Sequence, residues 1–235
     1  MLEGKNILVT AGGTMEYIDD IRVLTNISSG LLGKYISGAL LDNDAEVHYV
    51  CGKHSLLPDR LDINYLYRVK TAQDAFDAMK KVIDKYPIDA VVHSMAVSDF
   101  TFKRDIPVKC KSSDLDGFIE YMRQTIMPNP KIISQIKQWK KDITLVGFKF
   151  EVGKTVEELE ILARDSILKN GCDLVVTNDK KEMEKYGEHV AHLVLSEYAT
   201  KKLPEQYSYL SNKYTCEGKP SIAGAISDFL DGMLT

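Results

Sequence analysis

A glycine-rich turn directly after an apolar run constrains the fold of this chain more than any other feature. The run Asn6-Ile7-Leu8-Val9 is typical of a buried strand, and it leads straight into Thr10-Ala11-Gly12-Gly13-Thr14. Further along, Ser28, Ser29 and Gly30 open a segment whose apolar residues have helical spacing. The start of such a helix presents unpaired backbone N–H groups and the positive end of the helix dipole. The unit therefore suits a phosphate, as in a nucleotide or a phosphorylated substrate.

Composition argues against several classes of function. A net charge of −4 over 235 residues gives no electrostatic case for binding nucleic acid. The four cysteines lie far apart without a C-x-x-C pair, which is typical of free thiols in a reducing cytoplasm. No apolar stretch approaches the roughly 18–20 residues of a membrane span, and the first strand comes too early for a signal peptide. We expect a soluble, cytoplasmic protein that binds neither nucleic acid nor membrane.

Strand-like and helix-like patterns alternate along the chain, which predicts a mostly parallel sheet with helices on both faces. The expected strands are residues 5–10, 45–51, 63–69, 90–93, 145–148 and 174–177, and the expected helices are 29–41, 72–85, 129–137, 155–170 and 221–234. Residues 189–196 alternate like a half-buried strand, and 198–203 could pair with it antiparallel. We expect one domain over residues 1–235: α/β, a three-layer α/β/α Rossmann-like arrangement with a C-terminal antiparallel strand extension.

The segment 99–116 lacks hydrophobic periodicity and carries four cations, Lys103, Arg104, Lys109 and Lys111. Long segments without secondary structure inside a compact domain are usually functional or disordered. The cations favour a functional role, so we predict a flexible flap over about residues 100–116. A solvated surface loop is the alternative.

A nicotinamide-dependent oxidoreductase, NAD(P)-dependent and Rossmann-folded, is the first alternative function. That fold requires G-x-G-x-x-G closing directly into a helix and an acidic residue about 20 positions further on. Here a polar stretch, residues 16–22, follows the glycines, and the second expected strand ends in Val50-Cys51-Gly52 without a carboxylate. The fold is compatible, but the cofactor signature is missing. A non-catalytic nucleotide-sensing module is a second alternative.

Several motifs in sequence order resemble those of phosphopantothenoylcysteine synthetases, also called phosphopantothenate–cysteine ligases. They are Thr10-Ala11-Gly12-Gly13-Thr14-x-Glu16, Asp19-x-x-Arg22, Asn26-x-Ser28-Ser29-Gly30-x-x-Gly33, Ala96-Val97-Ser98-Asp99, Lys109-Cys110-Lys111, Asn129-Pro130, Gly147-Phe148 and the segment Asp173–Asp179. They cover the chain from about residue 5 to residue 180. No decarboxylase half precedes them, so we expect a stand-alone bacterial form of the ligase.

The resemblance implies a two-step reaction. The carboxylate of 4′-phosphopantothenate attacks the α-phosphate of a nucleoside triphosphate, CTP in the bacterial members, and pyrophosphate leaves. The amine of L-cysteine then captures the acyl-nucleotide to form the amide, 4′-phosphopantothenoylcysteine, in coenzyme A biosynthesis. The resemblance also implies Mg²⁺ arriving with CTP, no flavin, and a homodimer, for which the strands after residue 188 could supply an interface.

Two residues are implied as catalytic. Asn26 would donate to the oxygens of the acyl-phosphate region, and Lys109 would close over the triphosphate and neutralise the α-phosphate. A capping or turn role is the alternative for Asn26. The five histidines predict no metal site, because His189 and His192 in a strand would point to opposite faces.

A further set is implied to bind substrates. At the nucleotide the resemblance places Gly12, Gly13, Ser28, Ser29, Gly30, His93, Ser94, Met95, Asp99, Pro130, Lys131, Ile132, Ile133, Phe148, Arg164 and Lys169, and at the other substrate Arg22, Ala96 and Lys111. Three alternatives stay open: a turn or cap for Asp99, core packing for Phe148, and an ion pair with Asp19 or Asp20 for Arg22. Pro130 is expected at the first position of its helix.

Overall fold

The computed structural model describes residues 1–62, 65–103, 113–211 and 214–235. Its strands are β1 (Asn6–Ala11), β2 (Met15–Tyr17), β3 (Val23–Thr25), β4 (Glu46–Gly52), β5 (Leu66–Val69), β6 (Ile88–His93), β7 (Phe100–Phe102), β8 (Ile126–Pro128), β9 (Thr144–Glu151), β10 (Leu174–Asp179), β11 (Val190–Leu195) and β12 (Tyr214–Glu217). Its α-helices are α1 (Leu31–Asp42), α2 (Ala72–Lys85), α3 (Leu115–Thr125), α4 (Ile133–Trp139), α5 (Val156–Asn170), α6 (Lys180–Tyr186), α7 (Glu197–Lys202) and α8 (Lys219–Leu234), with a 3₁₀ helix at Glu205–Ser211.

One large sheet forms the centre of the fold, with the strand order β12-β11-β10-β9-β6-β1-β4-β5. The strands from β10 to β5 pair parallel, whereas β10–β11 and β11–β12 pair antiparallel. The expected mostly parallel sheet with an antiparallel C-terminal extension is therefore confirmed. Because parallel neighbours share the same direction, the carboxyl ends of β1, β6, β9 and β10 meet at one edge of the sheet.

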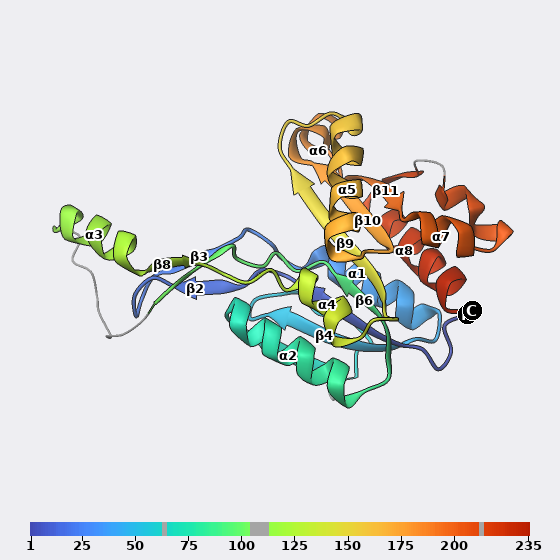
Figure 1. Ribbon diagram of the computed structural model, residues 1–235, viewed down its shortest axis with the longest axis horizontal. Helices are drawn as coiled ribbons and strands as arrows, with labels where there is room; N and C mark the ends of the chain where they lie inside the picture. Colours follow the sequence, from blue (N-terminus) through green and yellow to red (C-terminus); the bar gives the residue numbers. More distant parts are fainter. Residues whose placement is uncertain (63–64, 104–112, 212–213) are drawn as a thin grey trace.

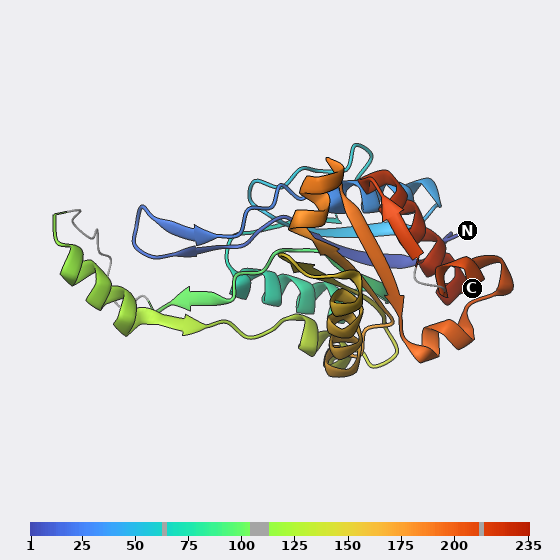
Figure 2. The ribbon, with the colours of Figure 1, turned by 90° about the horizontal axis from the view of Figure 1, so that it is seen from above.

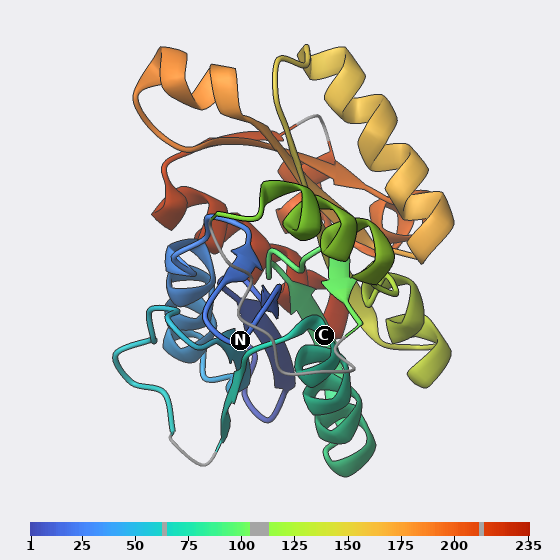
Figure 3. The same cartoon turned by 90° about the vertical axis from the view of Figure 1, so that its left-hand side faces the viewer.

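Helices cover both faces of this sheet, which confirms the three layers (Figures 1 and 3). In β1, Ile7 packs into one hydrophobic cluster and the next residue, Leu8, into the other, because successive side chains of a strand point to opposite faces. Helices α1 and α8 close the first cluster, where Phe229 is fully buried. Helices α2, α4 and α5 close the second, as shown by buried Met79 on α2.

Local signals set several helix ends. The Thr155 side chain accepts from the backbone N–H of Glu158, whose carboxylate bonds back to the Thr155 N–H, and Gly171 ends α5 in the left-handed conformation. The helix expected over residues 155–170 is thus confirmed. Pro130 was wrongly expected at the first position of a helix: α4 begins at Ile133, after the N-cap Ile132.

One prediction after residue 179 was wrong, and one helix in this region was not predicted. Residues 198–203 do not pair with β11, because the Ser196 side chain caps a helix there by accepting from the Ala199 N–H at 3.1 Å. Instead, β11 pairs antiparallel with β12 on one side and with β10 on the other. The polar segment after Asp179 forms the short helix α6, which the sequence pattern did not reveal; the Asp179 carboxylate caps it.

An arm extends away from the sheet on one side of the molecule (Figures 1 and 2). The hairpin of β2 and β3, the pair β7–β8 and the helix α3 form it. Buried Glu16 fixes its base, since its carboxylate accepts from the Ala72 N–H and from the Thr101 hydroxyl, both at 2.7 Å. The expected flap thus has secondary structure at both ends, in β7 and α3, whereas residues 104–112 lie outside the described part.

Candidate active site

A cavity of about 1120 Å³ lies at the sheet edge where β6, β9 and β10 end. It is lined by residues from separate parts of the chain: Asn26 and Ile27, residues 93–99, 129–133 and 148–150, then Lys180, Met183, Glu184, residues 187–189, and Lys219. Eleven predicted site residues thus share one cavity: Asn26, His93, Ser94, Met95, Ala96, Asp99, Pro130, Lys131, Ile132, Ile133 and Phe148.

The loop after β6 is held against the glycine-rich turn by a row of hydrogen bonds. The Ala96 N–H donates to the Gly12 carbonyl at 2.8 Å, and the Thr14 N–H donates to the Ala96 carbonyl at 3.3 Å. The Ser98 N–H donates to the Thr14 hydroxyl oxygen at 2.8 Å. Two segments more than eighty positions apart are thereby fixed side by side, and each N–H and C=O so used is satisfied without water.

The glycines of the turn are required by close approach and backbone conformation. Gly12 has φ +75°, and a Cβ there would lie 1.7 Å from the Ser55 hydroxyl oxygen. Gly30, with φ +73°, is the residue before α1, and a Cβ there would lie 3.1 Å from the Gly12 nitrogen. A Cβ on Gly13 would lie 2.8 Å from the Asn26 carbonyl oxygen. The turn, Asn26 and the start of α1 therefore form one compact unit.

Asn26 and Asp99 both line the cavity. The Asn26 side-chain amide donates to the Val97 carbonyl at 3.2 Å. The Asp99 carboxylate pairs with the Lys131 ammonium, while its backbone carbonyl accepts from the Asn129 N–H at 2.8 Å. The loops after β6 and β8 are thus joined at the cavity, and both Asp99 and Lys131 keep exposed side chains there.

His93, the last residue of β6, is buried at the base of the cavity. The Thr10 hydroxyl oxygen accepts from the Met95 N–H at 3.2 Å and lies within hydrogen-bond distance of His93 Nδ1, at 2.9 Å. Burial lowers the pKa of His93 to about 4, so the ring is neutral at physiological pH.

Several predicted residues do not line this cavity. Gly12, Gly13, Ser28, Ser29 and Gly30 form the adjoining turn and helix start. Arg22 lies on the arm, where its guanidinium pairs with Asp19 at 2.7 Å and lies over the Phe118 ring. On α5, Arg164 pairs with Glu160 and lines a separate cavity of about 320 Å³, and Lys169 pairs with Asp165. Lys109 and Lys111 lie outside the described residues.

One wall of the cavity was missed by the sequence reasoning. It consists of residues from α6, from the turn that leads into β11, and from the start of α8: Lys180, Met183, Glu184, Gly187, Glu188, His189 and Lys219. The sequence offered one signal for this wall, because Lys180 directly follows the Asp173–Asp179 motif. Nothing near Lys219 marked it, because α8 reaches the cavity only through the fold.

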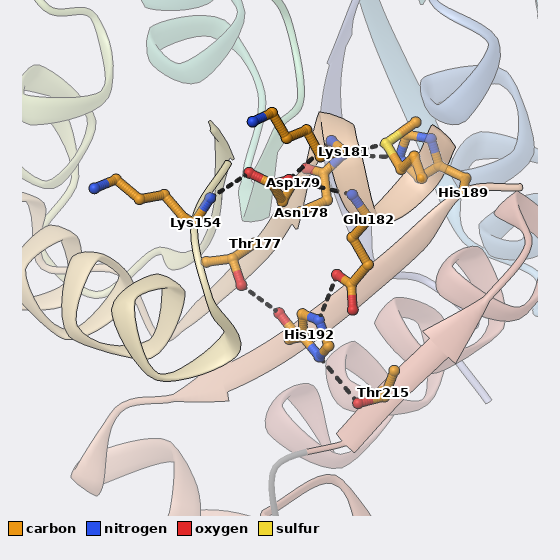
Figure 4. Close-up of polar contacts among 10 residues, drawn as sticks. Lys154, Thr177, Asn178, Asp179, Lys181, Glu182, His189, His192 and Thr215 are labelled. Carbon is orange, nitrogen blue, oxygen red and sulfur yellow. Dashed lines mark hydrogen bonds and ion pairs between the residues drawn. The ribbon is translucent and has the colours of Figure 1, made fainter. Parts of the chain in front are cut away.

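Polar contacts at the end of β10 hold this wall in place (Figure 4). The Asn178 amide donates to His189 Nε2 at 3.2 Å and lies 3.3 Å from the Met183 sulfur. The Asp179 carboxylate accepts from the N–H groups of Lys181, Glu182 and Lys154, and the hydrogen bond from Lys154 is the first cause of its lowered pKa. Asn178 and Asp179 therefore stabilise α6 and the turn before β11, but neither residue lines the cavity.

The site is suited to binding and orienting a polar, anionic ligand. It offers lysine ammonium groups, a side-chain amide and backbone N–H groups around one space. Burial raises the pKa of the Cys51 and Cys172 thiols to about 11 and about 12, and neither lines the cavity. Among the described residues no group of three or more His, Cys, Asp or Glu is arranged to hold a metal ion, and no described helix is long and apolar enough to cross a membrane.

Curated proteins and solved structures match most of this chain. The chain is 39% identical over 203 residues to the coenzyme A biosynthesis bifunctional protein CoaBC of Thermococcus kodakarensis, covering 86% of this chain and 48% of the relative. The chain spans about half the length of the curated relatives it matches. These relatives therefore contain a further part that this chain does not match.

Solved structures share the fold over nearly the whole chain. The DNA/pantothenate metabolism flavoprotein from Streptococcus pneumoniae superposes with a TM-score of 0.75 at 29% identity, covering 97% of this chain and 99% of that one. A Cab2 mutant in complex with phosphopantothenate-cysteine superposes with a TM-score of 0.67 at 17% identity, covering 98% and 89%, a likeness of fold. The model of the DNA/pantothenate metabolism flavoprotein C-terminal domain matches residues 2–209, and the chain belongs to this family.

Proposed function

We propose that this chain is a phosphopantothenate–cysteine ligase, which joins 4′-phosphopantothenate to L-cysteine through a phosphopantothenoyl-CMP intermediate in coenzyme A biosynthesis. One observation carries the proposal: segments far apart in sequence, around Asn26, Ala96–Asp99, Asn129 and Phe148, line the same cavity. These are the segments whose motifs resemble the ligase family. The relatives named for coenzyme A biosynthesis support the same reaction.

The chemistry would depend on positioning and charge rather than on a protein nucleophile. Asn26 lies at the rim, where its amide can donate to oxygens of an acyl-phosphate. Lys109 is proposed to neutralise the α-phosphate. Mg²⁺ accompanying CTP would shield the triphosphate, and it needs few protein ligands. Holding carboxylate and α-phosphate in line then supplies much of the rate.

Nucleotide recognition is proposed for the β6 side of the cavity. The backbone after His93, the Asp99 carboxylate, the turn at Pro130–Ile133 and the Phe148 ring surround the same space. Phe148 is partly buried and also packs against the core, so it can present one ring face to a base. Gly12, Gly13 and residues 28–30 are proposed as backbone donors beside them, with Ala96 and Lys111 at the second substrate.

The nicotinamide-dependent alternative is not favoured. Strand β4 ends at Cys51-Gly52 without the carboxylate that such a site places on the ribose. A nucleotide-sensing module would bind CTP without consuming it, and the experiment below distinguishes it from the ligase.

The test is release of pyrophosphate. Purified protein is incubated with phosphopantothenate and either CTP or ATP, and L-cysteine is then added while amide formation is followed by mass spectrometry. The ligase releases pyrophosphate only when phosphopantothenate is present, and it forms the amide only after cysteine is added. Nucleotide binding without pyrophosphate release would reject the proposal and favour the sensing module.

We further propose a cytoplasmic homodimer in which the arms of two copies pack together, with residues 1–235 acting as one ligase domain. The arm exposes apolar side chains that nothing in the described part covers, including Ile21, Leu24, Leu115 and Met127. The strands after residue 188 are a less suitable interface than the arm, because every residue of β11 is buried within its own chain. A strict monomer by light scattering at micromolar concentration would reject the dimer.

A further inference from the structure

Lysines on the cavity wall differ in whether a carboxylate already neutralises them. Lys131 pairs with Asp99, Lys149 with Glu151 at 3.0 Å, and Lys180 with Glu184 at 3.7 Å. Lys219 also lines the cavity, yet within the described ranges it forms no ion pair, not even with Glu188 on the same wall. Lys219 is a half-buried residue, and an ammonium without a carboxylate partner is well placed to pair with an anionic ligand.

The surroundings of Lys219 reinforce its positive charge. Lys219 is the first residue of the sixteen-residue helix α8, and its N-cap Gly218 makes no side-chain capping bond. The helix dipole therefore adds positive potential at this end. The neighbouring ring of His189 also experiences the ammonium: burial, and then the charge of Lys219, lower the pKa of His189 to about 4. Glu184, which pairs with Lys180, and Glu188 line the same wall, and the ammonium of Lys219 and the helix end are the groups there that attract an anion.

We propose that Lys219 is a substrate-binding residue that holds a phosphate group in the cavity that Asp99 and Phe148 also line. The inference rests on the proposed ligase function, because both phosphorylated substrates would enter this cavity. The phosphate belongs either to the triphosphate of the nucleotide or to 4′-phosphopantothenate. Residue 219 lies beyond the family-matched residues 2–209, so no motif assigns it this role.

The test compares Lys219→Gln and Lys219→Arg with a control, Lys141→Gln. Lys141 is exposed in the turn between α4 and β9, does not line the cavity, and changes the net charge equally. Calorimetry measures the Kd of inorganic tripolyphosphate and of phosphopantothenate, with unphosphorylated pantothenate as reference. Steady-state assays measure KM separately for CTP and phosphopantothenate, and thermal unfolding verifies that each variant is folded.

Loss of one charge-assisted hydrogen bond predicts a roughly ten- to hundredfold weaker binding of one phosphorylated ligand. Lys219→Gln should show this, Lys219→Arg should recover most of it, and Lys141→Gln should match the wild type. A higher Kd for tripolyphosphate together with a higher KM for CTP would show that Lys219 holds the triphosphate of the nucleotide. A higher Kd for phosphopantothenate, with the Kd of pantothenate unchanged, would show that Lys219 holds the phosphate of phosphopantothenate. Unchanged Kd and KM for both ligands in folded Lys219→Gln overturns the proposal.

The two proposals fail in different ways. If the wild type releases no pyrophosphate but binds tripolyphosphate in a manner that depends on Lys219, the ligase reaction is rejected and the phosphate site stands. If the wild type is an active ligase and Lys219→Gln matches it in both KM values, the ligase stands and the phosphate role is rejected.

Discussion

Replacing Gly12 by alanine tests the claim that the glycine-rich turn is shaped by contact and not merely by flexibility. The new Cβ would lie 1.7 Å from the Ser55 Oγ and 2.9 Å from the Ser55 Cβ. Ser55 must therefore move, although its hydroxyl donates to the Ala11 carbonyl at 3.2 Å in a buried position. Gly12 also has φ +75°, a conformation that disfavours every residue with a Cβ.

The cost follows from these two terms. The left-handed conformation costs an L-residue about 1–2 kcal/mol. Loss of the Ser55 hydrogen bond adds about 0.5–1.5 kcal/mol. We therefore expect Gly12→Ala to lower the free energy of unfolding by about 1.5–3.5 kcal/mol, measured from urea denaturation midpoints at constant m.

Two comparisons sharpen the test. Gly38→Ala is the matched control, because Gly38 lies within α1 and a Cβ there meets nothing within 4 Å. It should stabilise by about 0.5–1 kcal/mol. The double variant Gly12→Ala with Ser55→Gly should be less destabilised than the sum of the single variants, because the clash disappears. A Gly12→Ala protein within 0.5 kcal/mol of wild type, or strict additivity, would refute the reasoning.

Three further predictions concern the site, a helix end and pH. Asn26→Asp should reduce pyrophosphate release about 10²–10³-fold without lowering the melting temperature, because a rim donor is lost while the fold is kept; near-wild-type turnover would remove Asn26 from the catalytic set. Thr155→Ala should cost about 0.5–2 kcal/mol in urea unfolding, since it removes the cap that accepts from the Glu158 N–H, and an unchanged midpoint would contradict this. His93 stays neutral in the folded state down to about pH 4 but titrates near 6.5 when unfolded, so the unfolded state binds more protons between these values. Stability should then fall as pH drops through that window, by about 1.4 kcal/mol per pH unit for this group, and equal pH slopes for wild type and His93→Gln would disprove it.

The amino-acid order alone predicts the alternating strands and helices, because burial on both faces of a parallel sheet leaves continuous apolar runs such as Ile7-Leu8-Val9. It also determined ends that depend on neighbours in the chain, such as the Thr155 cap. The segments around Asn26, Ala96 and Asn129 were selected by their ordered motifs.

Which of these segments share a cavity depends on the long-range packing of the chain. Strand order brings the loop after β6 against the turn after β1, while α5 directs Arg164 and Lys169 elsewhere. Arg22 forms an ion pair with Asp19, three residues before it, which is one of the alternatives that the sequence left open. Lys219 reaches the cavity through the packing of α8, a long-range contact without a local trace. The type of each residue indicates the local backbone geometry. Which segments meet at one cavity depends on which strands become neighbours in the sheet.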